Sequence, residues 1–218
     1  MKRIIIVCEG PTEQEFIKSS LQIPFMNLNI YLQTPLIKAS RGGIVKWNKL
    51  KEQIETHLKS DTSAYVTTLI DYYGMYSKHG FPGWVDAHNI VDKRLRISTI
   101  QQAMLDDLDP TLQNRFIPYL QLHEFEGLLF NDIDIIKSQV PPKDLVGLNE
   151  LESTFRQFPD PEMINSNKAT CPSERLLRII NGYNKIVYGS IIAEAIGLDR
   201  LRAKSYLFNN WITQLEVI

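Results

Sequence analysis

Continuous apolar runs recur along the first part of the chain, and three of them predict buried strands. They occupy residues 3–8, 64–70 and 116–122, the last interrupted by Pro118. A strand covered on both faces has such a run instead of an alternating pattern. Residues 30–38 form a fourth, less regular segment, in which Pro35 predicts an edge strand.

Helix-like patterns lie between these runs. Apolar residues recur with helical spacing over residues 12–21, 44–58 and 84–108. The last range has room for two helices, and Ser98 with Gln101 forms a capping box that predicts the start of the second. This alternation of strands and helices predicts an α/β, Rossmann-like fold, with helices flanking a mostly parallel sheet of about four strands.

Residues 131–218 show mostly helical patterns. Helices are predicted over 174–181, 190–196 and 199–217. Ser173 is expected to cap the first of them. Because no repeat or low-complexity linker marks a boundary, we predict one domain over residues 1–218. Its α/β core would span 1–130, with residues 131–218 packed on that core as a helical extension.

The overall charge and the cysteine content exclude several classes of protein. With 24 Lys and Arg against 25 Asp and Glu, the net charge is −1, which excludes binding of nucleic acid through bulk positive charge. A protein that reaches phosphates through a metal ion and a few local cations is still allowed. Cys8 and Cys171 are too few for a disulfide framework. Together with the lack of an apolar run of ~20 residues, this predicts a cytoplasmic protein with no membrane partner.

Acidic residues follow three of the predicted strands. Glu9 and Glu13 follow the first strand, Asp71 follows the third, and Glu124 and Glu126 follow the fourth. Because open parallel sheets bind ligands outside the carboxyl ends of their strands, we expect these five carboxylates to meet at one edge. Such a cluster repels itself unless a cation compensates the charge. Oxygen ligands at an open site favour Mg²⁺ or Mn²⁺, which is how metal-assisted phosphoryl chemistry is built.

Each position also has a structural interpretation. Glu13 in a first helical turn favours the helix dipole, and Asp71 suits the end of a strand. Glu126 can pair with a surface cation, and a lone histidine such as His123 is typical of a core. Glu9 is hardest to explain structurally, because it directly follows a buried strand and precedes a glycine. The coincidence at three strand ends favours a site.

A phosphoryl transition state also needs fixed positive charge. The candidate cations are Arg41, Lys168, Arg175 and Lys185. We place Arg41 and Lys185 among the catalytic candidates with Glu9, Asp71 and Glu124; Arg41 is alternatively a solvated loop charge. Arg41, Lys168 and Arg175 are substrate-binding candidates, together with Ser173 at a helix N-terminus and Tyr73 as a stacking aromatic. Ser173 as a simple cap and Tyr73 as a packing residue are the alternatives.

Several blocks of the sequence carry a family resemblance. Glu9-Gly10-Pro11-Thr12-Glu13 resembles the opening motif of Toprim domains, in the form used by OLD-family nucleases. Further blocks look like the signature of the bacterial family called domain of unknown function 4276. They are Asp71-Tyr72-Tyr73-Gly74, Phe81-Pro82-Gly83, Arg115-Phe116-Ile117-Pro118-Tyr119, His123-Glu124-Phe125-Glu126-Gly127-Leu128-Leu129-Phe130, Pro172-Ser173-Glu174-Arg175 and Gly182-Tyr183-Asn184-Lys185.

The resemblance implies a Toprim-like fold and roles for its matching residues. Glu9 matches the glutamate that helps to bind metal and acts in acid–base transfer, and Glu13 matches a further metal ligand. Asp71 matches the first aspartate of the Toprim Asp-x-Asp motif, but Tyr73 stands where the second aspartate is expected. Either Glu124 or Glu126 supplies the missing carboxylate, or the site binds metal weakly.

Three functional hypotheses follow. The first is a Mg²⁺- or Mn²⁺-dependent Toprim-type nuclease acting on nucleic acid. The family often occurs beside ATPases in defence-type gene neighbourhoods, which implies a role in phage defence and an ATPase partner of the AAA or ABC type. Toprim proteins commonly pair, so the resemblance also implies a homodimer. The second is a non-catalytic interaction module of such an ATPase complex, and the third is a phosphohydrolase for a small phosphorylated molecule. The chain has no Gly-x-x-x-x-Gly-Lys-Ser/Thr loop, so any ATP dependence would come from a partner.

Overall fold

The structure is a computed structural model that describes residues 2–38, 43–164 and 167–218. A parallel sheet forms its centre, in the order β2-β1-β3-β4, with β5 paired to β3 beyond the end of β4. The strands are β1 (Lys2–Cys8), β2 (Ile30–Gln33), β3 (Tyr65–Asp71), β4 (Phe116–Ile117) and β5 (Leu120–Gln121). The predicted α/β fold class with a mostly parallel sheet is confirmed.

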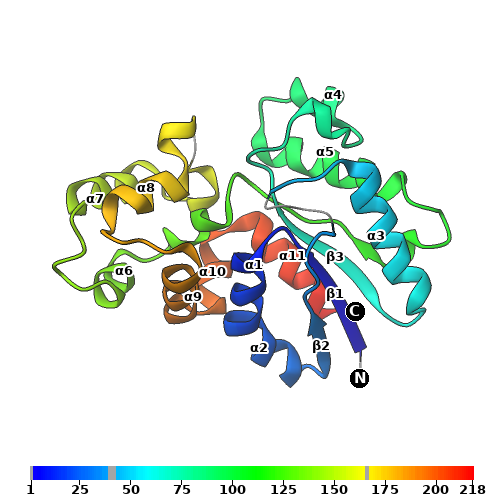
Figure 1. Ribbon diagram of the computed structural model, residues 1–218, viewed down its shortest axis with the longest axis horizontal. Coiled ribbons are helices and arrows are strands. Elements are labelled where there is room, and N and C mark those ends of the chain that lie inside the picture. Colours follow the sequence, from blue (N-terminus) through cyan, green and yellow to red (C-terminus); the bar gives the residue numbers. More distant parts are fainter. Residues whose placement is uncertain (1, 39–42, 165–166) are drawn as a thin grey trace.

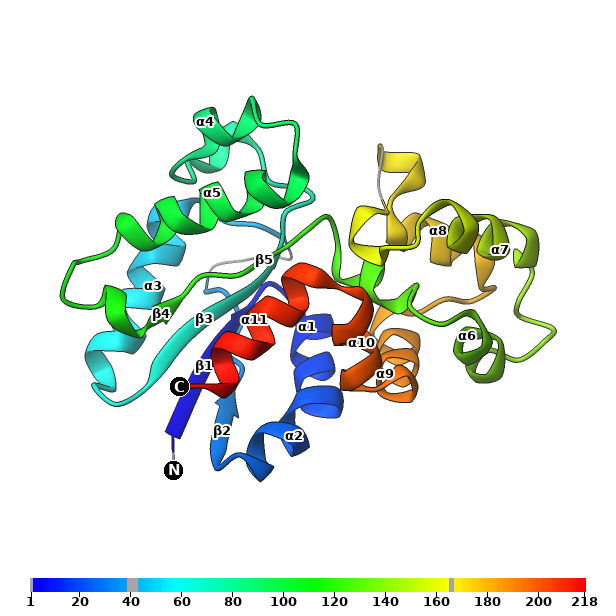
Figure 2. The ribbon, with the colours of Figure 1, turned by 180° about the vertical axis from the view of Figure 1, so that it is seen from behind.

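Helices cover both faces of the sheet, as its apolar strands require. α3 (Trp47–Ser60) and α5 (Lys93–Asp106) lie on one face, and α1 (Pro11–Phe16) and α11 (Tyr206–Glu216) lie on the other (Figures 1 and 2). Residues 4–8 of β1 and 66–70 of β3 are buried without interruption. The carboxyl ends of β1 and β3 therefore emerge from a packed core at one edge, where they position the residues that follow.

The first helical segment is longer than the sequence pattern predicts. α1 continues through a π-helical turn (Ile17–Leu21) into α2 (Gln22–Asn27), so the helix does not end at residue 21. The buried Phe25 extends its apolar face by one turn. The second predicted strand is shorter than expected and is regular only as β2. Beyond it, the Pro35 carbonyl still accepts a hydrogen bond from the Cys8 N–H at 2.9 Å, as befits an irregular edge.

Two predictions around the fourth strand need correction. After α4 (Trp84–His88), α5 begins at Lys93 and not at Ser98, because the Asp92 side chain caps it by accepting from the Leu95 N–H. The strand predicted over 116–122 is split at Pro118 into β4 and β5. The Thr68 hydroxyl spans the break, since it donates to the Tyr119 carbonyl and accepts from the Tyr119 N–H.

The chain after the sheet is helical, as predicted, with different boundaries. Its helices are α6 (Ile133–Gln139), α7 (Leu148–Gln157), α8 (Pro172–Ile179), α9 (Lys185–Ile196), α10 (Leu198–Lys204) and α11. Ser173 lies inside α8 and is not its cap, which is Cys171. The single last helix predicted over 199–217 is broken at Ser205.

The last helix returns to the sheet. The Trp211 ring stacks on Tyr119 with 4.4 Å between ring centroids, and its indole N–H donates to the Thr67 hydroxyl at 2.8 Å. The helices α6, α7 and α8 extend to one side of the sheet, and α9 and α10 connect them to α11 (Figures 1 and 2). Buried hydrophobic residues from both parts belong to one contiguous cluster. In the described part of the chain, no helix has the length and apolar character to cross a membrane.

Candidate active site

The carboxyl edge of the sheet brings acidic side chains together. Glu9 directly follows β1, Asp71 ends β3, and Glu124 precedes a 3₁₀ turn at Phe125–Leu129. The Asp71 N–H donates to Glu9 Oε2 at 3.1 Å, and the Phe125 N–H donates to Asp71 Oδ1 at 2.9 Å. These two hydrogen bonds tie the ends of three segments that are distant in sequence into one unit.

Burial and mutual repulsion disfavour the charged forms of these carboxylates. Glu13, Glu124 and Glu126 are 5%, 7% and 4% exposed. Burial raises the pKa of Glu9 to about 7, and the neighbouring Glu13 and Glu126 add to the rise. It also raises the pKa of Glu126 to about 7, with Glu124 as the main acidic neighbour. The pKa of Asp71 is raised well above its usual range by burial and by the other four acids. We call Glu9, Glu13, Asp71, Glu124 and Glu126 the carboxylate cluster.

Backbone donors and one cation compensate part of this charge. Glu13 Oε2 accepts from the Gly10 N–H at 2.7 Å. Glu124 accepts from the Ser173 N–H at 2.9 Å and from the Ser173 hydroxyl at 3.0 Å, which fastens it to the first turn of α8. The Lys185 ammonium lowers the pKa of Glu9, Glu13 and Glu126 against the larger effect of burial.

Lys185 reaches the cluster because α9 packs closely against α1 and the 3₁₀ turn. The Asn184 side chain caps α9 by accepting from the N–H groups of Ile186 and Val187, which places Lys185 at the first helical position. Gly189, one turn later, lies at this contact, where a Cβ atom would meet the Phe125 ring at 3.6 Å and the Thr12 methyl group at 3.9 Å, both ordinary van der Waals distances.

The family model named "Domain of unknown function (DUF4276)" matches residues 8–216. The chain belongs to this family. Among solved structures, it is similar to the C-terminal region of the Burkholderia pseudomallei OLD protein, with 17% identity over 98% of each chain and a TM-score of 0.49. A similarity this distant assigns no activity to the chain. No curated protein matches it.

The other residues singled out in this DUF4276 sequence lie in different surroundings. Tyr73 adjoins the cluster. Burial, Cys171 and Glu124 all raise its pKa, which indicates that its hydroxyl lies near Glu124. Ser173 binds Glu124, so its hydroxyl holds a member of the cluster. Arg175 is buried, and its guanidinium donates to the Thr170 carbonyl at 2.8 Å and to the Thr154 hydroxyl at 3.0 Å, joining α8 to α7. Lys168 is exposed in a 3₁₀ turn, and Arg41 lies outside the described residues.

Sequence reasoning did not assign a role to Tyr183. Its hydroxyl is buried and has no hydrogen-bond partner among the residues that the structure describes. Its pKa is raised well above the usual range, first by burial and then by Glu126 and Glu124, which locates the hydroxyl beside the cluster. The signal that could have found it is its place in the block Gly182-Tyr183-Asn184-Lys185, two residues before the cation.

The donor chemistry of the cluster fits a hard divalent cation. Carboxylate oxygens are the ligands that Mg²⁺ and Mn²⁺ prefer, and a bound cation would relieve the repulsion that raises these pKa values. Within residues 2–38, 43–164 and 167–218, however, no group of three or more His, Cys, Asp or Glu side chains is arranged so that it could hold a metal ion as it stands. Hydrogen bonds from Gly10, Asp71, Phe125 and Ser173 occupy some of the oxygens.

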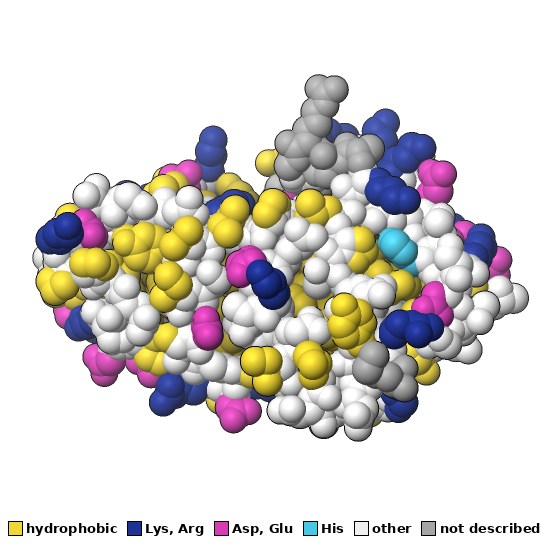
Figure 3. All heavy atoms as spheres, turned by 60° about the horizontal axis from the view of Figure 1, so that its bottom comes forward, with side chains coloured by type: hydrophobic (Ala, Val, Ile, Leu, Met, Phe, Trp, Pro, Cys, Tyr) yellow, Lys and Arg dark blue, Asp and Glu magenta, His cyan; other side chains and the backbone are white. Residues whose placement is uncertain are grey.

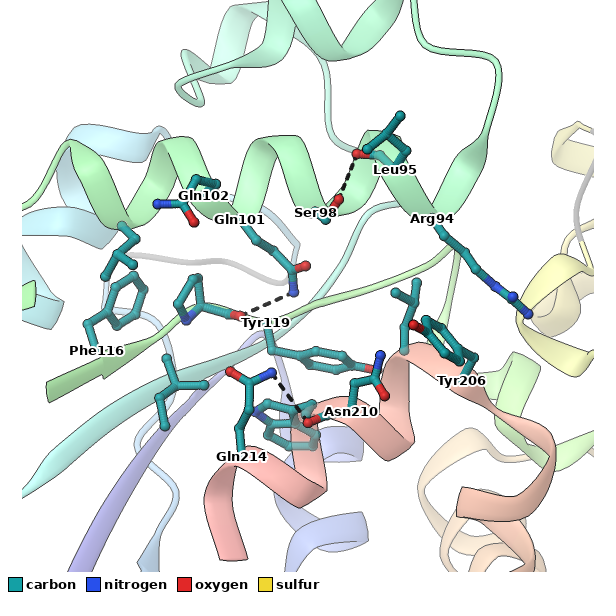
Figure 4. A pocket seen from close by; sticks show the side chains of 15 residues that line it. Arg94, Leu95, Ser98, Gln101, Gln102, Phe116, Tyr119, Tyr206, Asn210 and Gln214 are labelled. Atoms are coloured by element: carbon teal, nitrogen blue, oxygen red, sulfur yellow. Dashed lines mark hydrogen bonds between the residues drawn. The ribbon is translucent and has the colours of Figure 1, made fainter. Parts of the chain in front are cut away.

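A cavity of about 520 Å³ lies elsewhere, between α5, β4 and α11 (Figure 4). Amide side chains such as Gln101, Asn210 and Gln214 project toward it, and Gln101 Nε2 donates to the Pro118 carbonyl at 3.1 Å. No Asp or Glu of the described chain lines this cavity. It does not share the chemistry of the carboxylate cluster.

Proposed function

We propose that this DUF4276 protein is a Mg²⁺- or Mn²⁺-dependent phosphodiesterase, a nuclease of the Toprim kind. The observation that carries the proposal is the carboxylate cluster, in which acids from three strand ends meet at one edge, near enough to the exposed cation Lys185 for it to lower the pKa values of Glu9 and Glu126. An uncompensated cluster of this kind is costly to fold, and a divalent cation would offset that cost. Metal-dependent phosphoryl transfer uses such an edge.

The chain's own residues suit distinct roles around a phosphate. Glu9, Glu13, Asp71, Glu124 and Glu126 would hold the metal, which when bound supplies Lewis-acid stabilisation and an activated water. Lys185 adds fixed positive charge at the same edge, where a transition-state phosphate gains negative charge. The resemblance to Toprim motifs adds an acid–base role for Glu9. Ser173 positions Glu124 through two hydrogen bonds.

The remaining parts of the proposal rest on the family resemblance. We propose nucleic acid as the substrate, an AAA- or ABC-type ATPase as a partner, a role in phage defence, a cytoplasmic location, and a homodimer. We also propose that residues 1–218 act as one domain, with 131–218 as an extension of the core at 1–130. Tyr73, Arg41 and Lys168 stay candidates for contact with the substrate.

Calorimetric titration of Mn²⁺ into the purified protein tests the proposal. We expect saturable binding in the wild type and its loss in Glu9→Gln and in Asp71→Asn. Asp134→Asn, a change of an exposed acid in α6, is the matched control and should bind normally. Cleavage assays on single- and double-stranded DNA and RNA then follow, with Glu9→Gln expected to be folded and inactive. Retained cleavage in Glu9→Gln would reject the assignment.

A non-catalytic interaction module is the second candidate, and two observations favour it. No group of three or more described His, Cys, Asp or Glu side chains is arranged to hold a metal ion. The face that Figure 3 brings forward, which includes α2 and α9, carries hydrophobic side chains, and Ile23, Met26 and Val187 on these helices are exposed. This candidate predicts no Mn²⁺ binding up to millimolar concentration. A phosphohydrolase for small molecules would instead bind Mn²⁺ and cleave a phosphomonoester but no polynucleotide.

A further inference from the structure

A cavity of about 250 Å³ lies beside the segments that follow Asp71 and precede Glu124. The loop after β3, α4, α5 and His123, two residues after β5, form its walls. Its aromatic and imidazole lining consists of Tyr72, Tyr73, Tyr76, Trp84, His88 and His123. A small cavity with so many flat rings is suited to a flat ligand, because ring faces stack well on one another.

The rings form open walls and do not fill the space themselves. The Tyr72 and Trp84 rings lie 5.8 Å apart between centroids and are tilted by 35°, so they support one another at an angle. Trp84 is half-buried, whereas Tyr76 and His88 are exposed. Met75, which also lines the cavity, is buried in the hydrophobic core and anchors this loop there.

Positive charge surrounds the opening. Arg96 lines the cavity and is held by two hydrogen bonds to the Ile90 carbonyl, at 3.0 Å from Nε and 2.6 Å from Nη2. Lys93 Nζ lies 3.0 Å from His123 Nε2, and Lys78 Nζ lies 5.4 Å from the centre of the Tyr76 ring. These cations suit a ligand that carries phosphate next to its flat part.

Tyr73 links the cavity to the carboxylate cluster, because it lines the cavity and Glu124 is among the groups that raise its pKa. Tyr72 follows Asp71 directly, and His123 directly precedes Glu124. The two strand ends are cross-linked here, since the Tyr73 N–H donates to the His123 carbonyl at 2.8 Å. A ligand with its ring system in the cavity would therefore extend its remaining atoms along the carboxylate cluster.

We propose that this cavity binds one base of a single-stranded nucleic acid, stacked against Trp84, with the adjoining backbone at the carboxylate cluster. Its volume is below the ~300–1,000 Å³ of pockets for drug-sized ligands, which suits one ring system without its sugar and phosphate. The bases of an intact duplex are stacked on each other, so only an unpaired or flipped base reaches such a pocket. This inference rests on the proposed function and names its substrate class.

Tryptophan fluorescence tests it directly. Of the three tryptophans, Trp47 and Trp211 are 5% and 1% exposed, so quenching by a stacked base reports Trp84. Adenosine, ribose, an oligodeoxyadenylate and an abasic oligonucleotide of the same length are titrated, each with and without Mg²⁺. We expect saturable quenching by adenosine and tighter quenching by the oligodeoxyadenylate. Ribose and the abasic strand should have no effect.

Two variants at exposed positions check the location without endangering the fold. Tyr76→Ala and His88→Ala should each weaken the oligodeoxyadenylate complex by about tenfold, the usual order for a lost stacking contact. Tyr31→Ala, an exposed tyrosine on β2, is the control and should bind as the wild type does. Equal loss in Tyr31→Ala, or no loss in the two cavity variants, contradicts the proposal.

The remaining outcomes are equally decisive. Equal quenching by the abasic strand, or no quenching by any probe, overturns base binding. Quenching by adenosine alone assigns the cavity to free nucleosides and overturns the binding of a nucleic-acid strand. None of these readouts requires cleavage. Base binding without hydrolysis would reject the nuclease proposal and support base binding in the cavity. Hydrolysis without quenching would support the nuclease proposal and reject base binding in the cavity.

Discussion

Glu126 and Glu162 are both buried glutamates whose pKa burial raises to about 7, yet their surroundings differ. Glu162, in the 3₁₀ turn Pro161–Met163, accepts hydrogen bonds at 2.9 Å from the N–H groups of Leu207 and Phe208 at the start of α11. Glu126 is crowded by Glu124 and Glu13 and is offset by Lys185. The backbone satisfies the first carboxylate, whereas the second depends on charges from elsewhere. A raised pKa alone therefore does not mark a site.

The two regions compared are the carboxylate cluster and the surroundings of Glu162, and the largest expected difference between them is in activity. Asp71→Asn keeps an oxygen that accepts from the Phe125 N–H but removes the charge of one metal-ligand candidate. We expect no detectable cleavage of a labelled oligonucleotide with Mn²⁺ in this variant. Glu162→Gln should retain cleavage, measured at a temperature at which both variants are folded. An inactive but folded Glu162→Gln would end the distinction between the two regions.

Stability should change by smaller amounts. Glu162→Gln removes a buried charge but turns an amide NH2 toward one of the two N–H donors, so we expect the free energy of unfolding to change by less than about 1 kcal/mol. Glu126→Gln removes a buried charge among like charges and should gain about 1 kcal/mol. Urea unfolding at pH 8, in EDTA, measures both. A loss in Glu126→Gln would show that the carboxylate cluster is satisfied as it stands.

Without metal, the pH dependence of stability has the same sign in both regions. Glu9, Glu126 and Glu162 have folded pKa values of about 7 against an ordinary 4.5, so the folded protein binds more protons than the unfolded chain between these values. Their stabilising contribution is full below pH 4.5 and is lost as the pH rises through 7. Without metal, the free energy of unfolding should therefore fall over this window.

Mn²⁺ sharpens the same measurement. It should flatten the part of the pH dependence that comes from Glu9 and Glu126 and leave the part from Glu162 unchanged, because only the first two lie in the carboxylate cluster. Thermal unfolding across the window, with and without Mn²⁺, gives the two curves. Glu162→Gln should then remove the slope that remains with Mn²⁺. Superimposable curves with and without the ion would contradict metal binding at the cluster.

Parallel topology explains why the meeting of the acids was predictable from the sequence. Buried strands are recognisable from local apolar runs, and parallel strands bring their carboxyl ends to one edge. Glu9 and Asp71 directly occupy such ends, so no tertiary detail was needed to place them together. The family assignment was likewise available from local blocks and is confirmed by the match over residues 8–216.

Residues whose surroundings depend on tertiary packing were not predictable in this way. Ser173 has the local pattern of a cap, but its hydroxyl binds Glu124, which lies 49 positions away. Arg175 has the pattern of an anion-binding cation, but the packing of α8 on α7 commits its guanidinium to Thr154. The start of α5 was misplaced because Ser98 and Asp92 are both good caps, and the sequence alone does not rank them.

Tyr183 and Tyr119 provide the finest comparison, between two buried tyrosine hydroxyls. The Tyr119 hydroxyl donates to Gln121 Oε1 at 2.7 Å, whereas the Tyr183 hydroxyl has no partner in the described part of the chain and lies beside Glu124 and Glu126. Tyr119→Phe leaves the buried Gln121 oxygen unpaired and should cost about 1 kcal/mol in the free energy of unfolding. Tyr183→Phe removes an unsatisfied hydroxyl, so stability should be unchanged or slightly higher.

Activity should respond to Tyr183→Phe and not to Tyr119→Phe. We expect Tyr183→Phe to lower kcat for cleavage several-fold while Mn²⁺ binding, measured by calorimetry, stays at the wild-type level. Tyr119→Phe should leave kcat unchanged, since its hydroxyl is committed to the core. A hydroxyl with only a structural role would lower stability and spare kcat in Tyr183→Phe. A buried polar group without a partner is costly, so a measured benefit in kcat would explain why the fold tolerates this one beside the carboxylate cluster.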